Sequence, residues 1–575
     1  MTNQDIPPFN LLDEPWLRCV MRAPDGQAHP RPADLGLKDI VEHAHEIVEL
    51  TSPSPLITIS LYRLLLAIMH RVFGPADDDA WWDLWDAEKA DVVRLNAYLD
   101  MVRPRFNLFD KEKPFYQVQI DDEYAGSIAK LTHEHANTGN AVLLFDHGRG
   151  ADASGLSPAE AARYLVAFQA YAVGGLISYE KGLDPKIYKS ASAGPLVKGA
   201  VLLVRGANLW QTLLLNLVQY PRDEQDNGDA PAWERGANDP TTAKPRYPKG
   251  YLDYLTWQSR RVCLFPTRTP EGHVVVRRVA AMKGHPFGAG FERRHEETMV
   301  AFSYNEKAKP DDGQEVYPPL VFRDERALWR DSMTIFAAGG DKQPRRPHTL
   351  QWLDDLRVQH KLGLSALPLD ALGMRSDQAK VLAWHHERLP LPLAYLDATD
   401  ERSKALFSEL RTGLTLAESA GRALRDSTRT LAKLLIAPNA DDKNARQPLP
   451  ADVNGVAQSL GVERIYWAAL DEPFARFLVA LPLTQKPEED RASYDARFKD
   501  HVGAELDRWA DALDMAGRTA FESVTNGLDG SARALKAVAH GARARRAYMG
   551  KALSPYGAQR RRAVSHQQLP PTGTR

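Results

Sequence analysis

The chain has 575 residues, of which 43% are hydrophobic and 26% are charged, and its formal net charge at pH 7 is -2. Such a chain is too long for one hydrophobic core, so we expect a soluble protein of two or three domains. The near-neutral charge excludes a free-standing nucleic-acid binder with a basic surface all round, although local basic patches remain open. The two cysteines, Cys19 and Cys263, cannot form a disulfide framework or a four-cysteine zinc site, and they fit a reducing cytoplasm.

The first part of the chain is predicted to contain several helices and two short strands. The first ten residues lack the basic start and apolar core of a signal peptide. Helical spacing covers residues 38–50 and 55–73, and charged residues interrupt the second run, which favours a buried core helix over a membrane span. A tryptophan-rich helix follows around Trp81 and Trp85, and residues 105–110 and 114–117 are predicted as strands on either side of a polar turn.

The middle of the chain alternates between strand and helix patterns. An apolar run, 141–145, is expected to be a strand, and a polar, glycine-bearing loop follows it. Ser157 then opens a helix with a capping-box pattern that runs out at Gly174 and Gly175. Residues 201–204 predict a strand, and Asn208 is the expected cap of a leucine-rich helix. Alternating apolar residues between 251 and 287 predict a small antiparallel sheet with a tight turn at 270–272.

The pattern changes near residue 400. Leu410, Ala417, Leu424 and Leu431 recur at seven-residue spacing, and further helical patterns cover 463–481, 494–525 and 530–552. Several long helices in succession predict a bundle of about four helices. We therefore expect an α+β protein. A large mixed N-terminal domain with small antiparallel sheets (1–400) is followed by a C-terminal helical bundle (401–553) and a basic, disordered tail (554–575).

The sequence contains few signals of catalysis. No P-loop or Gly-x-Ser-x-Gly motif is present. His133 and His135, with His147 as a third ligand, give one alternative hypothesis, a metal-dependent hydrolase. The two histidines are not at the zincin spacing, however, so no metal and no cofactor are predicted, and the chain is not expected to be an enzyme.

Three features on loops are candidates for binding. Gly174 and Gly175 would let a backbone approach a duplex closely, because glycine has no side chain to obstruct it. Lys283 is predicted at a junction between a strand and a loop. Gln378 follows a glycine turn and is expected to open a helix. Each of these residues also has a purely structural interpretation, as a turn, a solvated lysine or a helix-start amide.

Many segments of the chain, in this order, resemble the large subunit of the type I-E CRISPR surveillance complex Cascade, the CasA family. The matching segments are FNLLDEPWL at 9–17, RFNLFDKEKPFYQ at 105–117, NAVLLFDHG at 140–148, the 157–175 helix with its glycines, PLVKGAVLLVRGANLWQTLLLNL at 195–217, PAWE at 231–234, LTWQ at 255–258 and IYWAALDEPFARFLVAL at 465–481. The resemblance spans residues 9 to about 550.

The resemblance implies a function in DNA recognition. In that family the subunit recognises the protospacer-adjacent motif (PAM) of double-stranded DNA from the minor groove, through a glycine loop, a lysine finger and a glutamine wedge. Matching flanks place these at Gly174 and Gly175, at Lys283 and at Gln378. A segment that approaches the PAM and the 5′ end of the guide RNA is placed at Asn140, Leu143, Leu144 and Phe145.

The resemblance also implies partners in the cytoplasm. These are the target duplex, the 5′ end of the CRISPR RNA, the other Cascade subunits (backbone, small and 5′-handle-binding) and a helicase-nuclease, without a membrane. A purely structural scaffold subunit is the other alternative hypothesis.

Overall fold

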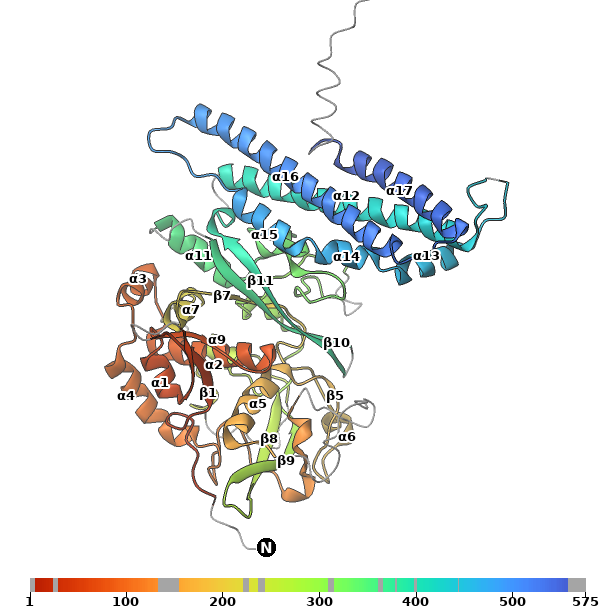
Figure 1. Cartoon of the computed structure of the whole chain (residues 1–575). Helices are drawn as coiled ribbons and strands as arrows, with labels where there is room; N and C mark the ends of the chain where they lie inside the picture. Colours follow the sequence, from red (N-terminus) through yellow and green to blue (C-terminus); the bar gives the residue numbers. More distant parts are fainter. Residues whose placement is uncertain are drawn as a thin grey trace, which may run out of the picture. The chain divides into compact units, whose positions relative to one another are not determined.

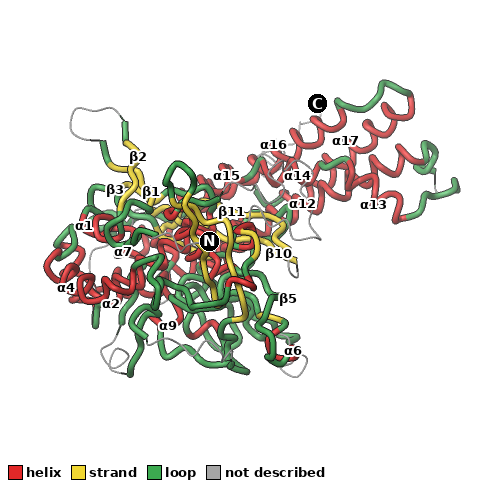
Figure 2. Tube along the Cα trace, turned by 90° about the horizontal axis from the view of Figure 1, so that it is seen from below, coloured by secondary structure: helices red, strands yellow, loops and turns green. Residues whose placement is uncertain are grey.

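The protein divides into two compact units. The structure, a computed structural model, describes residues 6–23, 29–132, 155–220, 227–235, 244–308, 315–359, 366–377, 380–397, 401–442 and 444–556. One unit comprises Met1–Phe322, Ala337–Gly363 and Leu367–Arg388, and the other comprises Arg323–Phe336, Leu364–Ala366 and Leu389–Arg575. The first unit mixes helices with small sheets and the second is helical, as Figures 1 and 2 show, which confirms the predicted fold class.

A small antiparallel sheet begins the first unit. Its strand order is β2 (Arg31–Leu35), β1 (Leu17–Met21) and β3 (Ile47–Leu50), and α1 (Leu37–Glu42) connects β2 to β3. The helix predicted over 38–50 is therefore wrong in its second half. Ile47 and Leu50 are both buried, and the backbone around them pairs with β1, so sheet pairing replaces a helix here.

Helix α2 (Pro55–Phe73) forms the core of the first unit. Its first turn is capped by Ser54, whose hydroxyl accepts a hydrogen bond from the Leu56 amide. Within the described residues it is the one helix that is long and apolar enough to span a bilayer, but 89% of that apolar window is buried inside the protein. The helix contacts α4 (Val92–Val102), α5 (Pro158–Tyr171), α7 (Leu209–Leu215) and α9 (Tyr251–Leu255).

The strands predicted at 105–110 and 114–117 are wrong. A 3₁₀ turn, η1 (Arg103–Phe106), is followed by turns, and side chains satisfy the backbone in place of a sheet. The Asn107 side chain accepts hydrogen bonds from the amides of Phe9 and Phe109. Phe106 is buried and stacks on Phe115, so these apolar residues fill the core without forming a ladder.

The predicted helix start at Ser157 is confirmed. The Ser157 hydroxyl accepts a hydrogen bond from the Glu160 amide, and the Glu160 carboxylate accepts one from the Ser157 amide, which completes a capping box at the start of α5.

Replacing this cap tests its energetic role. We expect Ser157→Ala to lower the stability of the first unit by about 1 kcal/mol, because the hydroxyl acceptor is lost and the Glu160 amide is left to solvent. Urea unfolding of the full chain measures the change. Ser157→Asp, which restores an acceptor, should recover most of it.

A second sheet has the order β11 (Lys380–Pro392), β10 (Ala366–Asp377) and β7 (Val201–Val204), and β7 pairs with Leu369–Leu372. The strand predicted at 201–204 and the cap predicted at Asn208 are confirmed, since the Asn208 side chain accepts a hydrogen bond from the Gln211 amide at the start of α7. The prediction that Gln378 opens a helix falls on a residue outside the described part of the chain. The described residues on either side of 378–379 form strands, since β10 ends at Asp377 and β11 begins at Lys380.

The third sheet has the order β4 (Gly126–Ser127), β9 (Val274–Lys283) and β8 (Arg260–Arg268). The predicted hairpin is confirmed, and Gly272 occupies its turn with a φ of 89°. The first part of the alternating pattern predicted between 251 and 287 is not a strand, because Tyr251–Leu255 form helix α9. The buried Asp229 carboxylate accepts hydrogen bonds from the Leu252 and Asp253 amides at the start of this helix and fixes its first turn.

The second unit is built around one long helix, α12 (Glu401–Ile436). Leu410, Ala417, Leu424 and Leu431 are all buried, which confirms the prediction from their spacing. Helices α13 to α17 pack against it or against each other (Figure 1). Their bounds are Pro450–Ser459, Val462–Ala468, Asp471–Ala480, Arg491–Thr525 and Ala532–Leu553.

The remaining short elements complete the description. They are α3 (Asp78–Asp86), η2 (Asp122–Tyr124), η3 (Ile128–Lys130), β5 (Gly175–Leu176), α6 (Pro185–Tyr188), β6 (Ser190–Ala191), η4 (Arg293–His295), η6 (Leu328–Asp331), α10 (Ser332–Ile335), α11 (His348–Gln359) and η7 (Leu393–Tyr395).

Candidate nucleic-acid interface

The two glycines after α5 form a backbone turn that other residue types fit poorly. Gly175 has a φ of 138°, in the region that favours glycine. A Cβ on Gly174 would lie 3.0 Å from the Ala193 amide nitrogen, so the chain passes its neighbour closely. Gly175 begins β5, which pairs with β6. We call residues 174–194, which leave the core at β5 and return after β6, the glycine strap.

Lys283 ends β9 beneath the glycine strap. Its Nζ donates a 2.6 Å hydrogen bond to the carbonyl of Ile187 in α6, which is part of the strap. One residue earlier, Met282 forms a parallel bridge with Ser178. The structure therefore brings Lys283 and the two glycines to one edge of the β8–β9 sheet.

A buried arginine joins these two parts. Arg260 is 3% exposed and is the register partner of Lys283 in the hairpin. Its guanidinium donates hydrogen bonds to the carbonyls of Val173 (2.8 Å) and Ser259 (2.8 Å). Burial lowers the pKa of Arg260 to about 10, so the side chain remains charged at neutral pH.

Two further contacts hold the strap on the sheet. The Arg261 guanidinium lies 2.9 Å from the Glu180 carboxylate, and both side chains are largely buried. The Lys181 amide donates a 2.9 Å hydrogen bond to the Tyr124 hydroxyl. The strap is therefore fastened at several points along its length.

The outer surface of the strap combines positive charge with apolar groups. Lys186 and Lys189 are exposed, and so are Leu176 (80%) and Ile187 (48%). Lysines can neutralise phosphates, and many proteins that bind the minor groove combine basic residues with apolar ones. The basic groups of the strap are local, since the chain as a whole is close to neutral.

Gln378 lies outside the described residues, and its two flanking strands are the nearest described elements. Gly373 in β10 approaches the backbone of the same unit closely, since a Cβ there would lie 2.7 Å from the Gly199 carbonyl oxygen. The His385 ring in β11 stacks on Phe322 with ring centroids 4.6 Å apart. These contacts hold both strands against the first unit.

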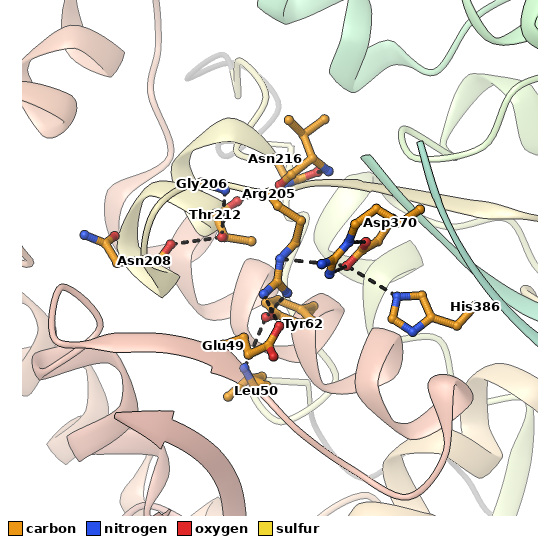
Figure 3. Close-up of polar contacts among 12 residues, drawn as sticks. Glu49, Leu50, Tyr62, Arg205, Gly206, Asn208, Thr212, Asn216, Asp370 and His386 are labelled. Carbon is orange, nitrogen blue, oxygen red and sulfur yellow. Dashed lines mark hydrogen bonds and ion pairs between the residues drawn. The ribbon is translucent and has the colours of Figure 1, made fainter. Parts of the chain in front are cut away.

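A polar network lies where β10 pairs with β7 (Figure 3). Asp370 of β10 is buried, and its carboxylate accepts hydrogen bonds from Arg388 at 2.6 and 3.1 Å. Arg205, which follows β7, lies 3.8 Å from the same carboxylate and donates 2.6 Å hydrogen bonds to Tyr62 and Glu49. The network joins β10 and β11 to α2 and β3.

The network also sets the charge state of its central carboxylate. Burial alone would raise the pKa of Asp370, but hydrogen bonds from His386 and Arg388 and the charges of Arg388 and Arg205 outweigh it. Together they lower the pKa from 3.8 to about 2. Asp370 is therefore ionised throughout the physiological range.

The other predicted site residues lie outside the described part of the chain. These are His133, His135 and His147 of the metal hypothesis and Asn140, Leu143, Leu144 and Phe145 of the RNA-proximal segment. Among the described residues, no group of three or more His, Cys, Asp or Glu side chains is placed to hold a metal ion.

Sequence reasoning missed Arg260 and Asp370, although a signal for Arg260 was present. Arg260, Val262 and Leu264 are alternate residues of β8, and all three are buried. The arginine therefore lies on the same face of the strand as the two apolar residues. A charged residue on that face is costly unless it has a specific partner.

The family model of the CRISPR-associated protein Cse1 matches residues 10–517 of the chain. This chain belongs to the Cse1 (CasA) family. A CasA/Cse1 protein of Thermus thermophilus is 33% identical over 544 residues, which cover 93% of this chain and 95% of the relative.

Solved structures show the same Cse1 fold. The crystal structure of Thermobifida fusca Cse1 has a TM-score of 0.75 at 25% identity, with coverage of 96% of this chain and 100% of that one. A chain from a structure named CRISPR RNA-guided surveillance complex has a TM-score of 0.68 at 21% identity, with coverage of 94% and 100%. The Cse1 match includes the glycine strap, Lys283 and the strands that flank 378–379.

Proposed function

We propose that this Cse1 family chain is a non-catalytic subunit of a type I-E CRISPR surveillance complex, Cascade, and reads the PAM of a target duplex from the minor groove. The observation that carries the proposal is the placement of Gly174, Gly175 and Lys283 at one edge of the β8–β9 sheet. Family membership and the likeness to a chain of a surveillance complex support it.

The chemistry of these groups suits a tolerant reader of a short motif. The minor groove distinguishes A·T from G·C pairs and little else. Backbone at Gly174 and Gly175 can come close to base edges, and the Lys283 ammonium donates to the acceptors that every pair presents there. Such a reading is sufficient where guide pairing supplies most of the sequence specificity.

Strand opening is assigned to Gln378 in this proposal. Opening the first base pair beside the PAM breaks its stacking, and unstacking costs about a few kcal/mol per step. An amide side chain inserted at this point would replace part of the lost stacking. Contacts to the DNA on either side offset this cost. Exposed lysines such as Lys186 and Lys189 on the glycine strap are placed to make them.

The proposal includes the partners that the complex requires. Asn140, Leu143, Leu144 and Phe145 would lie near the 5′ end of the CRISPR RNA. The helical second unit would contact the opened strands and the neighbouring backbone, small and 5′-handle-binding subunits, and the chain would help to recruit the helicase-nuclease. All of this takes place in the cytoplasm.

Substitution of Lys283 tests the proposal. In the assembled complex, we expect Lys283→Gln to lower affinity for a PAM-bearing duplex about tenfold, because a charged hydrogen-bond donor is lost. Gel shift with PAM-bearing and PAM-mutated duplexes measures the effect. Lys89→Gln is the matched control, since Lys89 is an exposed lysine between α3 and α4.

Equal affinity of the Lys283→Gln and parent complexes for the PAM-bearing duplex would contradict the site assignment. If omission of the whole chain left PAM preference unchanged, the chain would be a scaffold instead.

A further inference from the structure

We infer that Arg260 is the positioning residue of the proposed PAM reader, because it holds the backbone before the two glycines in register with Lys283. The inference rests on the proposed function of Gly174, Gly175 and Lys283 and adds a residue that does not itself contact DNA.

Arg260 is linked to both parts of the proposed reader, to the glycines through its side chain and to Lys283 through strand pairing. Its Nη2 donates to the Val173 carbonyl at 2.8 Å and to the Ala172 carbonyl at 3.4 Å, directly before Gly174. Its backbone lies opposite Lys283 in the β8–β9 register. The planar guanidinium therefore ties the end of α5 to β8, and β8 pairs with β9, the strand that carries the lysine.

A second residue fixes the backbone of Arg260 itself. Gln169 in α5 is 3% exposed, and its side-chain amide donates to the Arg260 carbonyl and accepts from the Arg260 amide, both at 2.9 Å. The Ser259 hydroxyl donates to the Gln169 carbonyl at 2.7 Å. Helix α5 and strand β8 are thus joined immediately beneath the glycine strap.

An arginine at this buried position contributes less to the stability of the fold than an apolar residue would. Only desolvation shifts its pKa, and among the described residues its hydrogen-bond acceptors are backbone carbonyls rather than carboxylates. A buried charge of this kind gains less than an apolar side chain of similar size would. The same guanidinium lies at the C-terminal end of α5, where positive charge is favourable, and fixes the path of the chain that leaves the helix.

The test compares two conservative substitutions. Arg260→Lys keeps the charge but loses the planar fork that reaches two segments. Arg163→Lys is the matched control. Arg163 lies in α5, is buried like Arg260, and donates to the backbone carbonyl of Trp16, which is outside the strap. Both variants are assembled into the complex with CRISPR RNA.

The decisive readout is the ratio of affinities for PAM-bearing and PAM-mutated duplexes, with Lys283→Gln measured in parallel. We expect Arg260→Lys to reduce the ratio about tenfold, with little change in affinity for the PAM-mutated duplex, and Arg163→Lys to leave the ratio unchanged. If Lys283→Gln reduces the ratio and Arg260→Lys does not, the positioning role is overturned and the proposed function stands. If neither does, both are overturned.

Amide hydrogen exchange supplies a readout that does not depend on DNA. In the Arg260→Lys chain, exchange at 174–176 and 187–191 should become about tenfold faster, while exchange in α2 stays as in the parent. Unchanged exchange in these segments would also overturn the inference. Faster exchange throughout the first unit would show that Arg260 supports the stability of the whole unit. That result would also overturn the inference.

Discussion

Asp370→Ala is expected to lower the stability of the first unit by about 3 kcal/mol, since removal of one partner leaves buried charge without compensation. The Arg205 side chain is 8% exposed, and among the described residues it would keep Glu49 and Tyr62 as side-chain partners. The loss should be at the low end of the range for a broken buried pair, because the Arg388 side chain is 56% exposed and can turn to water. Hydrogen-exchange protection of the β7 and β10 amides in the full chain measures the loss.

An exposed ion pair supplies the control. Arg18 and Asp34 join β1 to β2 with side chains that are 54% and 48% exposed. Asp34→Ala should cost about 1 kcal/mol or less, because solvent screens such pairs. A loss of the same size in both variants would show that the Asp370 network contributes no more than a surface pair.

Acid dependence gives a second check on the same network. The folded-state pKa of Asp370, about 2, lies below its ordinary value of 3.8. The stabilisation that it provides is therefore fully present above 3.8 and is lost as the pH falls toward 2. The difference in stability between the parent and Asp370→Asn should shrink over that interval. A constant difference down to pH 2 would contradict the assignment.

Gly284→Ala is expected to have a large effect on both structure and binding. A Cβ at this position would lie 2.5 Å from the Gln258 carbonyl oxygen and 2.6 Å from the Arg260 amide nitrogen. These neighbours are backbone atoms, so β8 must move away from β9 directly beside Lys283. We expect a cost of about 3 kcal/mol in stability. Because the proposed PAM reader would be displaced, we also expect about a hundredfold loss of affinity for a PAM-bearing duplex.

Unfolding in urea and gel shift of the assembled complex measure the two effects. Gly530→Ala, in the connection between α16 and α17, is the control, because nothing lies within 4 Å of the added carbon. It should leave both quantities unchanged or raise stability slightly. Parent-like DNA binding by Gly284→Ala would mean that the position of Lys283 does not matter.

Elements with strong local signals could be predicted from the sequence. The capping box at Ser157, the cap at Asn208 and the seven-residue spacing in α12 all depend on contacts within one helix or one face. The β8–β9 hairpin was predictable for a similar reason, since its turn at 270–272 lies between two alternating strands.

Elements that depend on distant partners could not be predicted in the same way. The 47–50 segment is a strand because β1 is available to pair with it, and 105–117 is irregular because Asn107 and aromatic packing satisfy it. In the candidate site, Lys283 and the glycines were predicted individually. Their juxtaposition, and the part played by Arg260, depend on the fold that brings α5 and β8 together.

The hydrogen bond from Lys283 to the Ile187 carbonyl has a consequence for the speed and selectivity of binding. A free lysine side chain loses about 1.5–2 kcal/mol of rotamer entropy when it is ordered. Here folding has already ordered it. In the proposed PAM reader, a duplex would therefore need only to offer a better acceptor than one peptide oxygen. An encounter that offered none would leave the lysine on Ile187, and the complex would release that DNA quickly.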